Sequence, residues 1–127
     1  MGDIVGGPAL TVLLIEDDQL IRMITAELLA DLGHEVIEAS NGEEALAAMQ
    51  DVPIDILITD LGLPGASGAD IAAKARETSP NLGVIFATGS AQAPPIPGGG
   101  APAYLLCKPY DGAGLAAALR AVGVPAG

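Results

Sequence analysis

Polar groups that could bind metal or phosphate follow the apolar segments of this sequence. There are carboxylates after the first and third segments, a hydroxyl after the fourth and an ammonium after the fifth: Glu16, Asp17, Asp18, Asp60, Thr88 and Lys108. Carboxylates gathered at one place repel one another unless a cation lies among them. Because this set offers oxygen ligands without histidine or cysteine, it points to Mg²⁺.

Asp60 is the most informative of these residues, because it ends an apolar run and a loop rich in glycine and proline follows it. A buried carboxylate without a partner costs several kcal/mol, so Asp60 needs a role. With a metal beside it, Asp60 could attack phosphorus and form an aspartyl phosphate. The Thr88 hydroxyl and the Lys108 ammonium would then contact the phosphoryl oxygens. Gly62 leaves room near the acceptor, and its backbone carbonyl could be a further metal ligand.

Alternating apolar segments and helical patterns would position these residues. Short apolar runs predict five strands, at residues 11–15, 34–39, 54–60, 83–87 and 103–107. Helical patterns lie at about 19–32, 42–50, 68–78 and 112–122. Strict alternation predicts an α/β fold, with a parallel sheet covered on both faces by helices. In such a sheet the site lies at the carboxyl ends of the strands, where the polar residues above would converge.

Three local patterns refine this prediction. The first helix rests on apolar residues at helical spacing, Leu20, Ile21, Ile24, Leu28 and Leu32, with Asp18 as N-cap. The last helix offers Leu115, Leu119 and Val122 to the core. Residues 91–102 hold four prolines and three glycines where a further helix is due, which predicts an irregular loop or one turn.

Length and composition favour one domain at residues 11–122, with a loose leader at 1–10 and a tail at 123–127. A formal charge of -11 argues against partners that present a phosphate backbone or an anionic membrane surface. The single cysteine, Cys107, cannot form an internal disulfide, and no export or lipidation signal is evident. We therefore expect a cytoplasmic protein that binds neither nucleic acid nor membrane.

Taken together, the motifs resemble those of the receiver domains of two-component response regulators. The matching stretches are residues 13–18, Asp60 with Pro64 and Gly68 after it, residues 87–89, and Lys108-Pro109. The resemblance implies a flavodoxin-like, doubly wound five-stranded parallel sheet in the order 2-1-3-4-5, with the fourth helix short or absent.

The resemblance also implies a role for each site residue. Asp60 would be the phosphoacceptor, Thr88 the switch hydroxyl and Lys108 the phosphate partner. Asp17 would bind Mg²⁺ directly and Glu16 through water, with the Gly62 carbonyl as a further ligand. Such a domain takes its phosphoryl group from a phosphohistidine on a histidine kinase or histidine phosphotransfer protein and signals by protein contact. It is not an enzyme beyond self-catalysed phosphotransfer and autodephosphorylation.

Three residues before Lys108, the sequence departs from the usual receiver pattern. Leu105 stands where typical receivers carry an aromatic residue, and Tyr104 lies one residue earlier, which predicts that Tyr104 points to the other face of the sheet. The stretch Phe86-Ala87-Thr88-Gly89 is similar to a subgroup of receivers with an F-A-T-G motif. That subgroup occurs as single-domain regulators and as terminal domains of hybrid kinases.

Three other functions fit parts of the pattern. A magnesium-dependent phosphohydrolase with an aspartyl nucleophile would carry an acid/base aspartate where this chain has Gly62. A flavin binder would share the fold, but residues 16–18 would repel its phosphate. A degenerate receiver that acts only as a docking module would lack part of the site, whereas this chain has every member of it.

Overall fold

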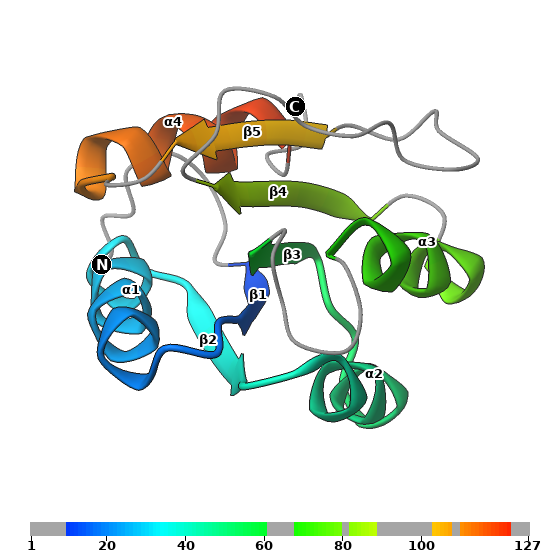
Figure 1. Cartoon of the computed structure of the whole chain (residues 1–127). Coiled ribbons are helices and arrows are strands. Elements are labelled where there is room, and N and C mark those ends of the chain that lie inside the picture. Colours follow the sequence, from blue (N-terminus) through cyan, green and yellow to red (C-terminus); the bar gives the residue numbers. More distant parts are fainter. Residues whose placement is uncertain (1–9, 61–67, 80–81, 89–102, 108–109, 123–127) are drawn as a thin grey trace.

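The computed structural model describes residues 10–60, 68–79, 82–88, 103–107 and 110–122. In these residues the chain forms five strands and four helices, which alternate up to β4 (Figure 1). The elements are β1 Thr11–Ile15, α1 Gln19–Asp31, β2 Glu35–Ala39, α2 Gly42–Asp51, β3 Ile56–Asp60, α3 Gly68–Thr78, β4 Gly83–Thr88, β5 Ala103–Cys107 and α4 Gly112–Val122. The predicted elements are confirmed, with shifts of one or two residues at some ends.

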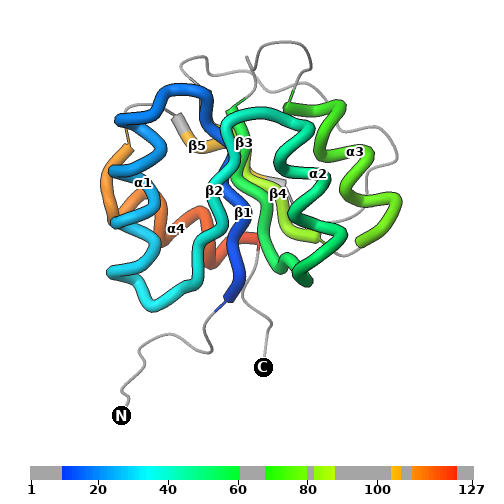
Figure 2. The backbone as a smooth tube through the Cα atoms, turned by 90° about the horizontal axis from the view of Figure 1, so that it is seen from below, coloured from blue at the N-terminus to red at the C-terminus, as the bar shows by residue number. Residues whose placement is uncertain are grey.

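The five strands form one parallel sheet in the order β2-β1-β3-β4-β5, as the resemblance implied. Helices α1 and α4 cover one face of the sheet, and α2 and α3 cover the other (Figure 2). This is a flavodoxin-like arrangement, in which the strand order reverses between β1 and β3. The carboxyl ends of β1 and β3 therefore lie side by side at one edge of the sheet.

Each face of the sheet has its own apolar core. Leu13, Ile15 and Leu57 pack with α2 and α3, whereas Val12 and Ile56, which are offset by one position, pack with α1 and α4. The central strands are apolar on both faces because both are covered, which explains their continuous apolar sequence. The prediction for the last helix is confirmed, since its three named residues, Leu115, Leu119 and Val122, are all buried.

Helix α1 forms where the sequence predicted it, but its buried face differs from its apolar stripe. Leu20 is 65% exposed and Ile24 is 51% exposed, while Thr25 and Leu29 are buried. The polar residues of the inner face have partners there: the Arg22 guanidinium donates to the Glu16 carbonyl, and Thr25 hydrogen bonds to Tyr110. These contacts set the rotation of α1, so a pattern of apolar spacing alone does not identify its buried side.

Side-chain caps define where α1 and α2 begin. The Asp18 carboxylate accepts from the Ile21 N–H, which confirms the predicted N-cap. Asn41 accepts from the Glu44 N–H, and Glu44 accepts in return from the Ser40 backbone N–H and hydroxyl. Both helices start at the carboxyl end of the sheet, so the caps also fix the loops around the site.

The predictions for the leader, the loop at 91–102 and the tail fall on residues outside the described part of the chain, apart from Leu10, so those boundaries stay predictions. Among the described residues, none of the helices has the length and apolar character needed to cross a bilayer.

Candidate functional site

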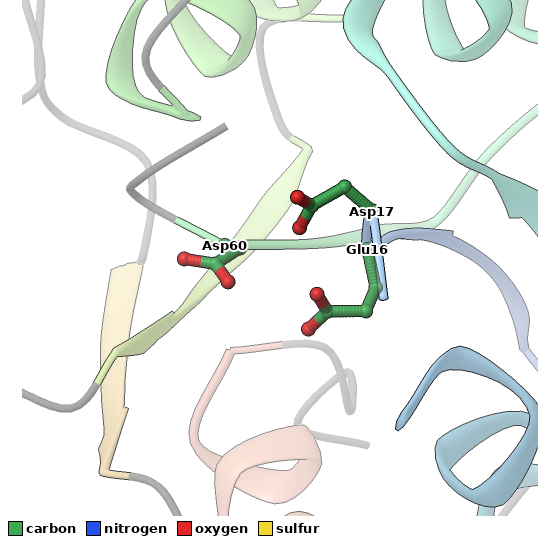
Figure 3. Close-up of side chains that lie close together, drawn as sticks. All are labelled: Glu16, Asp17 and Asp60. Carbon is green, nitrogen blue, oxygen red and sulfur yellow. The ribbon is translucent and has the colours of Figure 1, made fainter. Parts of the chain in front are cut away.

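Three carboxylates meet at the carboxyl ends of β1 and β3. One ligand oxygen from each of Glu16, Asp17 and Asp60 can be chosen so that all lie within 4.8 Å of one another. Figure 3 shows Glu16 and Asp17 reaching from the loop after β1 towards Asp60 at the end of β3. Glu16 is buried, Asp60 is partly buried and Asp17 is exposed, so the group opens to solvent on the side of Asp17.

Strand register accounts for this meeting. Ile15 of β1 pairs with Thr59 of β3, so the next residue of each chain segment, Glu16 and Asp60, follows at the same level of the sheet. The Glu16 N–H donates to the Ala39 carbonyl of β2 at 3.1 Å, which extends the β1–β2 pairing by one residue. Glu16 is therefore held one residue beyond the end of β1, before the chain turns into α1.

Asp18 belongs to the start of α1 and lies outside the group of three. Its carboxylate caps the helix, and its carbonyl accepts from the Arg22 N–H at 2.9 Å. The Asp18 N–H in turn donates to a Glu16 carboxylate oxygen at 3.1 Å. Of the three consecutive acids, the first two face Asp60, and the third fixes the turn that presents them.

Arg22 provides positive charge beside these acids. Its Nη1 donates to the Glu16 carbonyl at 2.7 Å, and its Nε lies 3.4 Å from a Glu38 carboxylate oxygen. The Ser40 backbone N–H holds the pKa of nearby Glu44 below its usual value, and Arg22 adds a smaller effect in the same direction. Since Glu38 is well exposed, its ion pair adds little stability. The main effect of Arg22 is to fix the backbone that carries Glu16 and Asp17.

Helix α3 begins against the backbone of Asp60. A Cβ atom built on Gly68 would lie 2.5 Å from the Asp60 carbonyl oxygen and 3.1 Å from the Thr59 side chain. No real side chain tolerates that separation from a backbone atom, so only glycine fits here without displacing Asp60. Gly68, which the sequence identified as part of a motif, is needed for this close contact.

The other predicted site residues are only partly described. Thr88 ends β4, and the preceding residue, Ala87, pairs with Asp60, so the end of β4 lies next to the carboxylates. The Thr88 side chain, Gly62 and Lys108 lie outside the described residues. Their proposed roles therefore stay predictions from the sequence.

The faces of β5 agree with the predicted departure from the usual pattern. Leu105 pairs with Phe86 and packs on the core beneath α2 and α3. Tyr104 pairs with Ile85, which belongs to the opposite core, and it is 36% exposed. An aromatic side chain at Tyr104 is thus on the other face of the sheet from the position it would occupy at Leu105.

Sequence reasoning missed two polar features near the site. Arg22 and Thr25 lie on the inner face of α1, where the apolar spacing gave no sign of them. Their separation of three residues is a helical signal in itself, but polar residues at such spacing usually mark a solvent face. The structure is needed to assign them to the interior.

Comparison with known proteins finds similarity over nearly the whole described chain. Residues 12–120 match the response regulator receiver domain family. The response regulator receiver protein CpdR of Brucella abortus is 35% identical over 101 residues, which are 78% of this chain and 84% of CpdR. The sensor kinase CckA of the same organism is 36% identical over 84 residues, which are 65% of this chain but 9% of the kinase.

Solved structures give the same result for the fold. The chemotaxis protein CheY4 of Vibrio cholerae superposes with a TM-score of 0.79 at 26% identity, covering 91% of this chain and 99% of CheY4. The receiver domain of the hybrid histidine kinase CckA superposes with a TM-score of 0.74 at 33% identity, covering 87% of this chain and 95% of that domain. The chain is thus similar both to a chemotaxis protein that it covers almost completely and to a small part of a much longer kinase.

Proposed function

The chain belongs to the response regulator receiver domain family, and we propose that it accepts a phosphoryl group on Asp60 in a magnesium-dependent reaction. The observation that carries this proposal is the meeting of Glu16, Asp17 and Asp60 at the carboxyl ends of β1 and β3. The donor is a phosphohistidine on a histidine kinase or histidine phosphotransfer protein, as expected for two-component signalling. The proposed location is the cytoplasm, where such partners present their histidines.

Asp60 is the nucleophile in this proposal. One of its carboxylate oxygens forms a bond to phosphorus while the bond from phosphorus to the donor histidine nitrogen breaks, and the electron pair of that bond returns to the imidazole. Gly68 supports the step because it allows α3 to approach the Asp60 backbone and hold it in place. Later attack of water on the phosphorus returns the carboxylate and releases phosphate.

The donor set fits a hard divalent cation. Three carboxylates supply oxygen ligands only, and the group opens towards solvent, as suits an ion that keeps several waters. Glu16, Asp17 and Asp60 would hold Mg²⁺, together with the Gly62 carbonyl. When bound, the ion offsets the negative charge that the acidic side chains and the phosphoryl group bring together. Thr88 and Lys108 would hydrogen bond to the remaining phosphoryl oxygens.

Helix α1 supports a protein as the donor. Leu20, Met23 and Ile24 are each about half exposed or more, and α1 begins directly after the acidic loop. Exposed apolar residues grouped on one helix are typical of protein interaction sites. A donor protein that packs on α1 would bring its phosphohistidine close to Asp60.

Replacement of Asp60 by asparagine tests the proposal. We expect Asp60→Asn to abolish Mg²⁺-dependent phosphorylation by a cognate kinase or a small-molecule phosphodonor, measured by intact-protein mass spectrometry. Asp51→Asn, at the exposed end of α2, removes the same charge away from the site and should leave phosphorylation unchanged. Labelling of the Asp60→Asn variant at the wild-type level would overturn the assignment.

The same assay separates the alternatives. A docking module would bind its partner protein but would acquire no phosphoryl group on any residue. A phosphohydrolase would turn over many equivalents of a small phosphate ester, whereas a receiver transfers one phosphoryl group from an activated donor to itself.

A further inference from the structure

A hydrogen bond inside the molecule joins helix α1 to the segment after β5. The Thr25 hydroxyl oxygen lies 2.8 Å from the Tyr110 phenol oxygen. Thr25 is 1% exposed, and Tyr110 is partly buried against the core beneath α1 and α4. The bond connects residues far apart in sequence and is partly buried beside this apolar core, where a hydrogen bond is stronger than in water.

Each end of this bond lies close in sequence to a residue of the proposed site. Helix α1 starts directly after Glu16 and Asp17, so Thr25 belongs to the rigid element that follows them. Tyr110 stands two residues after Lys108. The bond therefore ties the helix behind the acidic loop to the residue that follows the lysine segment.

Tyr110 is also fixed within its own segment. On one side, Cys107 ends β5 and is in register with Thr88 of β4. On the other side, Asp111 accepts from the Gly114 N–H at 2.8 Å and so starts α4. Lys108 and Pro109 are the only residues between the end of β5 and Tyr110. The described residues on either side of these two, Cys107 and Tyr110, are thus each held by contacts with other elements.

We propose that Thr25 and Tyr110 are positioning residues for phosphoryl transfer, whose hydrogen bond fixes Tyr110, two residues after Lys108, against the helix that follows Glu16 and Asp17. This inference rests on the proposed function, in which Lys108 contacts the phosphoryl group. A valine and a phenylalanine would fill nearly the same space, but apolar contact fixes direction less strictly than a hydrogen bond. Because phosphoryl transfer depends on placement of charge, a small displacement of the ammonium slows the reaction.

Single replacements test the bond with little change in volume. Thr25→Val and Tyr110→Phe each remove one hydroxyl, and Thr25→Ser keeps the hydroxyl as a rescue variant. We expect the first two to lower the rate of phosphorylation by about five- to tenfold at saturating Mg²⁺, since one hydrogen bond is at stake. Thr25→Ser should stay within about twofold of wild type. Phosphoramidate is the donor, so that docking of a protein on α1 does not enter the measurement.

A second background distinguishes positioning from general destabilisation. In Lys108→Ala, the ammonium is gone, so Thr25→Val should cause no further decrease in rate. If Thr25→Val lowers the phosphorylation rate equally in the wild-type and Lys108→Ala backgrounds, the inference is overturned. It is also overturned if, in the wild-type background, Thr25→Val lowers the melting temperature but leaves the phosphorylation rate unchanged. If wild type itself acquires no phosphoryl group on Asp60, the proposed function fails first, which is a separate result.

Discussion

The two ends of the sheet use polar side chains in different ways. At the amino ends, polar side chains bind the backbone of neighbouring segments: His34 Nδ1 accepts from the Leu10 N–H at 3.1 Å, and Asp55 accepts from the Thr11 N–H at 2.9 Å. At the carboxyl ends, Glu16, Asp17 and Asp60 direct their carboxylates towards one another. Polar residues at the first end stabilise the fold, whereas those at the second concentrate negative charge.

Strand β3 shows the difference within one short segment. Asp55 immediately precedes the strand and Asp60 ends it, so a carboxylate stands at each end. Asp55 joins the start of β3 to the start of β1 through both its side chain and its backbone N–H. Asp60 lies among other acids, an arrangement that favours a bound cation over stability of the free protein. The two aspartates thus have different roles because they stand at opposite ends of the same strand.

The largest expected effect comes from replacing Asp17 and, for comparison, Asp55, and measuring the Mg²⁺ dependence of phosphorylation and the free energy of unfolding. Asp17→Asn should raise the Mg²⁺ concentration needed for half-maximal phosphorylation by at least about tenfold, because it removes a charged ligand. Without Mg²⁺ its free energy of unfolding should be equal to or above that of wild type, since one of three like charges is lost. Asp55→Ala should do the opposite, lowering the free energy of unfolding by about 1 kcal/mol and leaving the Mg²⁺ dependence unchanged.

Mg²⁺ titrations of phosphorylation and urea unfolding in EDTA provide the two measurements. A loss of stability in Asp17→Asn together with an unchanged Mg²⁺ dependence would remove the distinction between the two ends of the sheet.

Gly68 offers a smaller effect that links stability to the carboxyl end. Gly68→Ala places a Cβ atom against the Asp60 carbonyl, so α3 or Asp60 must shift, at a cost of about 1–3 kcal/mol. Phosphorylation should slow because the nucleophile moves with its backbone. Gly114→Ala is the matched control: its Cβ meets its nearest neighbour at 3.4 Å, and it should raise the free energy of unfolding by about 0.5–1 kcal/mol. Unfolding curves and phosphorylation rates that match wild type in Gly68→Ala would contradict this account.

The sequence predicted the sheet, its covered faces and the meeting of three carboxylates, because each depends on strong local patterns. Apolar runs identified the strands, and their alternation with helices required parallel crossovers. Once the strands are parallel and the order places β1 beside β3, their carboxyl ends are neighbours at one edge, so Glu16, Asp17 and Asp60 come close. Their convergence therefore followed from topology, without knowledge of any side-chain contact.

The rotation of α1 and the polar contacts at the amino ends were not predictable in the same way. Five apolar residues outline a stripe on α1, yet Arg22 and Thr25 face inward, where Arg22 donates to the Glu16 carbonyl just before the helix and Thr25 hydrogen bonds to the distant Tyr110. His34 and Asp55 likewise bind backbone groups of the segment that starts β1. Apolar periodicity indicates which face of a helix is apolar on average, and it does not show which polar residues find hydrogen-bond partners in the interior.

The smallest expected effect concerns His34 at the amino end. Partial burial lowers the pKa of His34 from its ordinary value of 6.5, and its Nδ1 accepts from the Leu10 N–H only when that nitrogen is unprotonated. Above about pH 6.5 the imidazole is neutral in both the folded and unfolded states, so its contribution to stability is complete. As pH falls below that value the unfolded state takes up the proton first, and the free energy of unfolding decreases until the folded-state pKa is passed.

His34→Asn tests this pH dependence, because asparagine keeps an acceptor near the position of Nδ1 and does not titrate. His34 is the single histidine of the sequence, so the difference between wild type and variant isolates its proton uptake. Urea unfolding at about pH 7.5 and about pH 5.5 should show a larger loss of stability on acidification in wild type than in His34→Asn. Phosphorylation of Asp60 at pH 7.5 should be the same in both proteins, since His34 lies at the opposite end of the sheet. Equal losses of stability in the two proteins would mean that the hydrogen bond to Leu10 does not depend on the protonation of His34.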